Sequence, residues 1–111
     1  MSIDVKEYID VDDALKRVGG NMGLYQKLLG RFAESNQLEE LESLLASGNI
    51  EDATRMAHTI KGVAANLSLL KLRFTSADLE QSLKEGTDYT EKLDELREVY
   101  GVSIQVIHDL I

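Results

Sequence analysis

Residues 57–62 read "AHTIKG", and this stretch holds the side chains best suited to chemistry. His58 is one of two histidines in the chain, Lys61 follows it three residues later, and Gly62 follows it four residues later. Residues three and four apart lie on the same face of a helix. A free imidazole titrates near pH 6.5, so its neutral, nucleophilic form is abundant at cytoplasmic pH. A flexible ammonium suits the charge of a phosphoryl group. The spacing predicts a docking site with a nucleophile, without naming the reaction.

The helical pattern around His58 predicts that its side chain faces solvent. On a helical wheel, His58 lies about 140° from the centre of the apolar face and beside Gly62. A glycine inside a helix lowers the stability of the helix by about 1 kcal/mol relative to alanine. A glycine at this position therefore suggests that the bare surface beside His58 has a function. Between residues 51 and 75 the net charge is +2, although the whole chain carries −8. The alternative is that His58 is a solvent-exposed histidine without a function. The apolar face comprises Ala53, Met56, Ala57, Ile60, Ala64 and Leu67.

The stretch "AHTIKGVAANLS" resembles the signature of histidine-containing phosphotransfer (HPt) domains, which reads roughly A-H-x-[LI]-K-G-x-[AS]-x-x-[LIV]-G. "DVDDALKRVGGNMGLYQKLLGRF" is similar to the family's N-terminal helix and the start of its first long helix. "ADLEQSL" resembles part of the family's helix after the histidine. Ser68 stands where the family usually has glycine, and we expect it to cap the following helix.

The resemblance implies that His58 accepts a phosphoryl group and exchanges it with an aspartate of a response-regulator receiver domain. It implies that Lys61 stabilises the phosphoryl charge and that Glu80, 22 residues after His58, hydrogen-bonds the other ring nitrogen and orients the imidazole. The expected partners are a receiver domain and a sensor or hybrid histidine kinase. We expect no cofactor and no metal on this chain, since Mg²⁺ belongs to the receiver in this family. The expected receiver-docking face around His58 comprises Gly62, Ala65 and Arg55.

Two alternatives compete with a phosphorelay intermediate. A degenerate HPt-like or structural helical adaptor would bind partners without phosphotransfer, but it would be expected to lose one of His58, Lys61 and Gly62. A dimeric histidine-kinase core is disfavoured, because the chain is too short for a nucleotide-binding segment. We therefore expect no autonomous kinase activity and leave open whether the protein counts as an enzyme.

The elements that must position these residues are helices. Apolar residues make up 43% of the chain and proline is absent, which favours long uninterrupted helices. Short connections force neighbouring helices to run antiparallel. We expect an all-α, antiparallel up-down four-helix bundle with a short extra N-terminal helix, in one HPt-like domain over residues 1–111. Residues 1–20 would hold the N-terminal segment and short helix, and residues 21–111 the bundle. The expected helices cover 11–18, 21–46 as one helix or two, 50–66, 69–85, and a last helix beginning at Asp88.

Composition excludes several classes of protein. A net charge of −8 disfavours nucleic-acid binding, and no stretch approaches the length of about 18 apolar residues that a membrane span needs. No secretory signal is visible and cysteine is absent, so we expect a cytoplasmic protein. We also expect the protein to be a monomer.

Two further residues invite a functional reading. We assign His108 to the helix dipole rather than to catalysis. Phe74, with Leu70 and Ala77, forms a second apolar stripe on its helix. We expect this stripe to pack inside the protein, while exposure of Phe74 would favour a docking patch.

Overall fold

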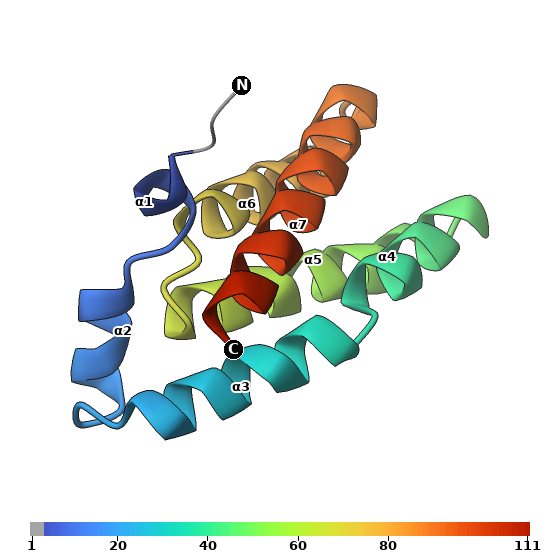
Figure 1. The fold of residues 1–111 in the computed structure, drawn as a ribbon. Coiled ribbons are helices and arrows are strands. Elements are labelled where there is room, and N and C mark those ends of the chain that lie inside the picture. The colour runs from blue at the N-terminus through green and yellow to red at the C-terminus, as the bar shows by residue number, and fades with distance from the viewer. Residues whose placement is uncertain (1–3) are drawn as a thin grey trace.

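The computed structural model describes residues 4–111, which form seven helices (Figure 1). The first three residues of the expected N-terminal segment lie outside the described residues. The helices are α1 (Val5–Tyr8), α2 (Val11–Arg17), α3 (Met22–Glu34), α4 (Gln37–Ala46), α5 (Ile50–Asn66), α6 (Leu70–Glu85) and α7 (Thr90–Leu110). The expectation of an all-α bundle is confirmed.

The bundle closes because each of its long helices packs against two neighbours. Helix α5 packs against α4 and α6, α6 packs against α7, and α7 packs against α3 (Figure 1). The segment 21–46, left open between one helix and two, is two helices joined at Asn36. Asn36 has a φ of 54°, in the left-handed region, and this conformation breaks the helix between α3 and α4. The two together form one arm of the bundle.

Side-chain caps begin three helices near the starts of the expected ranges. Asp10, Asn21 and Asn49 each accept a backbone N–H of the helix that follows, at α2, α3 and α5 respectively. The α1 helix, capped by Asp4, is a short addition that the sequence pattern did not predict.

The predicted caps of the last two helices are wrong. Ser68 adopts a φ of 56°, and Leu69, without a side-chain hydrogen bond, is the N-cap of α6. Ser68 thus takes the left-handed conformation that glycine adopts most easily, at the position where we noted a missing glycine. Asp88 accepts a hydrogen bond from the Thr90 N–H, but the N-cap of α7 is Tyr89, so the last helix begins two residues later than expected.

The turn between α5 and α6 is tied to the N-terminal part of the chain. The Asp10 N–H donates to the Ser68 carbonyl at 3.0 Å, and the Ser68 hydroxyl donates to Asp13 Oδ2 at 2.7 Å. The Tyr25 hydroxyl, from α3, donates to the Leu67 carbonyl at 2.7 Å. These contacts fix the point where the two helices of the histidine site meet.

The core contains the predicted apolar face of α5. Ala53, Ala57, Ile60 and Ala64 are buried, and Met56 is half-buried. Phe74 on α6 is 65% exposed, so the expectation that it packs inside the protein is wrong. Among residues 4–111, no helix combines the length and the apolar composition that crossing a bilayer requires.

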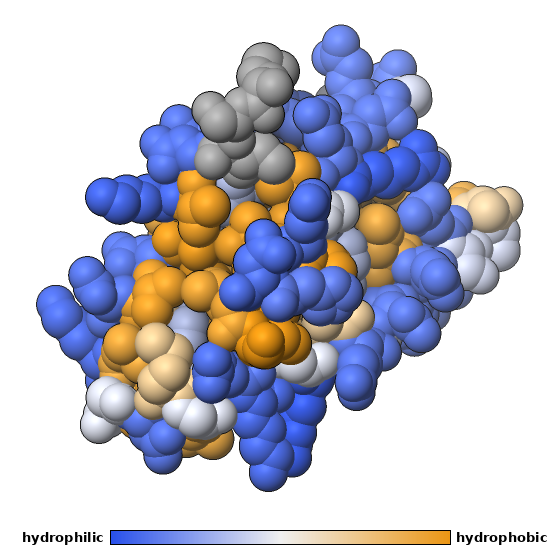
Figure 2. All heavy atoms as spheres, viewed as in Figure 1, coloured by the Kyte–Doolittle hydropathy of each residue, from blue (hydrophilic) through white to orange (hydrophobic). Residues whose placement is uncertain are grey.

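One face of the molecule gathers hydrophobic surface over α1, α2 and the C-terminal end of α7 (Figure 2). Val5 in α1 and Ile111 after α7 are each about half exposed. These elements differ from α5 and α6, which carry His58 and Glu80.

Candidate functional site

His58 projects from the solvent-facing side of α5. Its side chain is 65% exposed, whereas its neighbour Ala57 is fully buried. Gly62, one turn further along, is exposed, and a Cβ added there would meet no atom within 4 Å. The helix surface beside the imidazole is therefore open to another molecule.

Glu80 on α6 is the buried partner of this histidine. Its side chain is only 4% exposed, and its Oε2 lies 3.0 Å from His58 Nδ1. Lys61 Nζ lies 2.8 Å from Glu80 Oε1, and Lys84 Nζ lies 3.0 Å from Glu80 Oε2. Two helices thus bring one imidazole and two ammonium groups around a single carboxylate. We call these four side chains the Glu80 cluster.

The Glu80 cluster keeps its carboxylate ionised. Burial alone would raise the pKa of Glu80, but hydrogen bonds from Lys61, Lys84 and His58 outweigh burial and lower that pKa to about 2. An ionised carboxylate accepts hydrogen bonds and donates none. Since Glu80 Oε2 can only accept, its contact places the proton of a neutral imidazole on His58 Nδ1. The lone pair then lies on Nε2, which Glu80 does not contact.

The other residues expected at the site lie on the same helix, but with different surroundings. Ala65 is half-buried. The Arg55 guanidinium is occupied by Glu51 and Asp52 on its own helix, at 2.7 and 3.0 Å, and its side chain remains 70% exposed. These surface ion pairs are weak, so Arg55 can exchange them for a partner's carboxylate.

Lys84 is the member of the Glu80 cluster that the sequence analysis missed. It follows Glu80 by four residues on α6. Oppositely charged residues at this spacing face each other on a helix, so the pair could have been found once Glu80 was singled out. His108 is exposed on α7 and forms no hydrogen bond with the cluster in the described residues 4–111.

No metal site is ready-made in the part of the chain that the structure describes. Within residues 4–111, no three His, Cys, Asp or Glu side chains come together as metal ligands. The residues that could receive a ligand at the site are the exposed nitrogen of His58 and the ammonium of Lys61.

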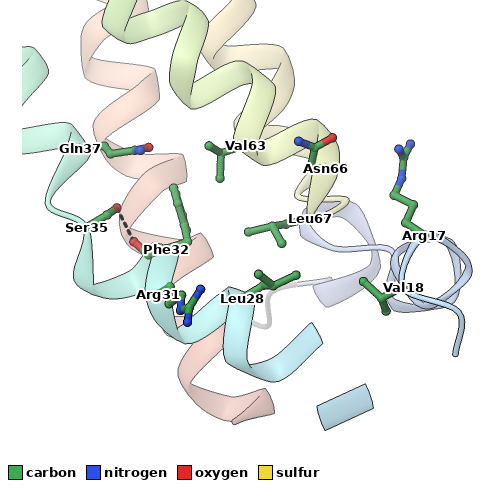
Figure 3. A pocket seen from close by; sticks show the side chains of 10 residues that line it. All are labelled: Arg17, Val18, Leu28, Arg31, Phe32, Ser35, Gln37, Val63, Asn66 and Leu67. Atoms are coloured by element: carbon green, nitrogen blue, oxygen red, sulfur yellow. Dashed lines mark hydrogen bonds between the residues drawn. The ribbon is translucent and has the colours of Figure 1, made fainter. Parts of the chain in front are cut away.

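A groove of about 730 Å³ lies on another side of α5, between α5, α3 and α2 (Figure 3). Apolar side chains point into it from α3 and α5, with arginines of α2 and α3 at its edge. None of the four residues of the Glu80 cluster lines it. The lining residues are Arg17, Val18, Leu28, Arg31, Phe32, Ser35, Gln37, Val63, Asn66 and Leu67.

The fold and the site together define a class of protein: a helical bundle that presents one histidine, with a charged partner set, on an open helix face. The family model described as Hpt domain matches residues 27–103, more than half of the chain. The chain belongs to the Hpt domain family, whose function is histidine phosphotransfer in two-component systems and whose members interact with kinases and receiver domains. Neither the search of curated proteins nor the search of solved structures returned a match.

Proposed function

We propose that this protein is a phosphorelay intermediate that carries a phosphoryl group on His58 Nε2. It takes the group from the phosphorylated aspartate of a receiver domain, and it returns the group to such an aspartate in the reverse step. The observation that supports this assignment best is the geometry of His58, whose Nδ1 is held by a buried carboxylate while the ring is 65% exposed.

The transfer step forms one bond to phosphorus and breaks one. The lone pair of His58 Nε2 forms a bond to phosphorus as the bond between phosphorus and the aspartate oxygen breaks. The leaving electron pair stays on the aspartate carboxylate. The Nδ1 proton remains in place, so the imidazole acquires positive charge beside the ionised Glu80. Phosphoryl transfer is mostly positioning and charge stabilisation, and this arrangement supplies both.

Lys61 and Gly62 have separate roles in this proposal. The Lys61 ammonium, one turn from His58, neutralises the charge on the phosphoryl oxygens. Gly62 leaves room for the partner's loops, and Arg55 with Ala65 borders the docking face. The Mg²⁺ ion is supplied by the receiver domain, and we assign no metal or cofactor to this chain.

In this proposal the protein acts as a monomer. A cysteine-free sequence is compatible with the cytoplasm, where we place the exchange. Size-exclusion chromatography tests the first of these two statements.

The test is the transfer of radiolabelled phosphate from a phosphorylated receiver domain to the wild-type protein, His58→Gln and His108→Gln. We expect an acid-labile, alkali-stable label on the wild type and on His108→Gln, and none on His58→Gln. The exposed position of His58 leaves the folded structure of the variant intact, which circular dichroism checks.

Two results would reject the proposal. Label retained by His58→Gln would place the phosphoryl group elsewhere. Binding of receivers by the wild type without any label would make the protein an adaptor, the alternative that the sequence left open.

A further inference from the structure

The Glu80 cluster contains one more cation than the proposed reaction uses. Lys61 Nζ lies 2.8 Å from Glu80 Oε1, which no other side chain of the cluster contacts. Lys84 Nζ and His58 Nδ1 each lie 3.0 Å from the other oxygen, Oε2. Lys61 comes from α5, the helix of His58, and Lys84 comes from α6, the helix of Glu80. The two lysines therefore hold the same carboxylate from two different helices.

The charge of the cluster must be redistributed when a phosphoryl group arrives. Before transfer, with a neutral imidazole, one carboxylate and two ammonium groups give the cluster a net charge of about +1. After transfer the phosphoryl oxygens carry about −2 and the imidazole carries +1, so the net charge falls to about 0. Lys61 lies one turn from His58 and can swing towards the new charge. To do so it must leave a carboxylate that is almost completely buried.

A buried carboxylate does not release a counterion without a cost. Removing one partner from a buried ion pair leaves an uncompensated charge, which is strongly unfavourable. Lys84 reduces that cost, because its ammonium remains beside Glu80 Oε2. The side chain of Lys84 is 57% exposed, so the free energy lost by removing its charge from water is small. Without Lys84, the departure of Lys61 would leave Glu80 with the imidazole N–H alone.

We propose that Lys84 is a positioning residue for phosphoryl transfer. Lys84 remains paired with Glu80 throughout the reaction, and this pairing allows Lys61 to leave Glu80 and bind the phosphoryl group. The inference rests on the proposed function of His58. It assigns Lys84 no contact with the phosphoryl group, so the effect of Lys84 must pass through Lys61.

A double-mutant cycle tests this dependence. The rate constant of transfer from a phosphorylated receiver is measured by rapid quench for the wild type, Lys84→Met, Lys61→Met and the double variant. We expect Lys84→Met to slow transfer about three- to fivefold in the wild-type background, as for a partly exposed ion pair. In the Lys61→Met background, the same change should have almost no effect.

Two control variants keep the interpretation specific. Lys84→Arg retains the charge and should transfer at nearly the wild-type rate. Lys92→Met removes another lysine that faces a carboxylate of α6, Asp78 at 4.0 Å, and should leave the rate unchanged. Circular dichroism melts of all variants establish that the folded proteins are compared.

The outcomes separate this inference from the proposed function. An unchanged rate in Lys84→Met would overturn it, and so would an equal loss in both backgrounds, which would mean that Lys84 contacts the phosphoryl group itself or acts only through general charge. If the wild type accepts no phosphate at all, the proposed function fails, and the inference about Lys84 fails with it.

Discussion

At the scale of single residues, the unusual member of the site is Glu80 rather than His58. A carboxylate that is 4% exposed is tolerated here because three donors surround it. The same carboxylate sets the imidazole tautomer and anchors two lysines. Structural and chemical demands on this residue therefore coincide, and replacing it should disturb both stability and transfer.

The lowered pKa of Glu80 predicts how stability depends on pH. The pKa of Glu80 is about 2 in the folded protein, below its usual value of about 4.5, which we take for the unfolded chain. The unfolded state therefore binds more protons between these values, and the stabilisation present above pH 4.5 is lost as the pH falls towards 2. We expect Glu80→Gln to lower the free energy of unfolding by a few kcal/mol at most at pH 7. The difference from the wild type should shrink between pH 4.5 and 2.5, as measured by urea unfolding.

Glu85→Gln is the matched control for this prediction. Glu85 lies on the same helix, but it is exposed, and in the described part of the chain its carboxylate accepts a side-chain hydrogen bond from Gln81 alone. Its replacement should change stability little, by a similar amount at both ends of the pH range. A constant difference between Glu80→Gln and the wild type over that range would contradict the lowered pKa.

At the scale of elements, α5 combines two faces with opposite requirements. Small buried residues such as Ala57 and Ala64 face the core, and the open side at Gly62 faces solvent. The sequence predicted this helix to its ends, 50–66, because its start carries an Asn cap and its apolar residues follow the helical period. Local sequence signals were sufficient to predict the bounds of α5, because the residues that determine them lie within or next to the helix.

The start of α6 was not predictable from local signals. Ser68 is buried and left-handed, and its hydroxyl donates a hydrogen bond to Asp13, which lies 55 residues away in the sequence. A sequence pattern records that serine is a good cap, but it does not record that a distant carboxylate holds the side chain. For the same reason, the role of Glu80 came from family resemblance, whereas its burial and its pairing with Lys61 came from the packing of α5 against α6.

Gly62 gives a prediction that separates helix stability from access to the site. An added Cβ meets no atom within 4 Å at Gly62 or at Gly101 in α7, so alanine fits at both positions. Each alanine variant should be more stable by up to about 1 kcal/mol in urea unfolding, because alanine favours the helix.

A larger side chain distinguishes the two positions. Gly62→Leu should slow phosphotransfer from a receiver by at least an order of magnitude through steric exclusion, whereas Gly101→Leu should not change it. Equal transfer rates in the two leucine variants would mean that the partner does not approach across Gly62.

At the scale of the whole molecule, the site depends on a turn that three residues of α2 and α3, including the N-cap of α2, hold in place. Residues 10, 13 and 25, from outside α5 and α6, bind the backbone or side chains of residues 67 and 68. This attachment fixes α6 against α5 at one end, and the pairing of Glu80 with His58 and Lys61 depends on that alignment. The N-terminal helices thereby contribute to the site without lining it.

The Tyr25 hydroxyl tests this long-range support. Tyr25 is 1% exposed, and burial, with a smaller contribution from Asp10, raises its pKa to about 12, so the hydroxyl remains a donor at any physiological pH. Tyr25→Phe removes the 2.7 Å hydrogen bond and leaves the Leu67 carbonyl without that partner. We expect the free energy of unfolding to fall by about 1–2 kcal/mol.

Tyr89→Phe provides the comparison, since Tyr89 is half-buried and its hydroxyl forms no hydrogen bond within residues 4–111. Its removal should change the free energy of unfolding by less than about 0.5 kcal/mol. In Tyr25→Phe, amide hydrogen exchange should rise first in the turn at residues 67–69 and at the start of α6, because local opening there precedes global unfolding. If protection in that turn is unchanged while the free energy of unfolding falls, the Tyr25 hydroxyl stabilises the core as a whole. The position of the turn would then not depend on this hydroxyl.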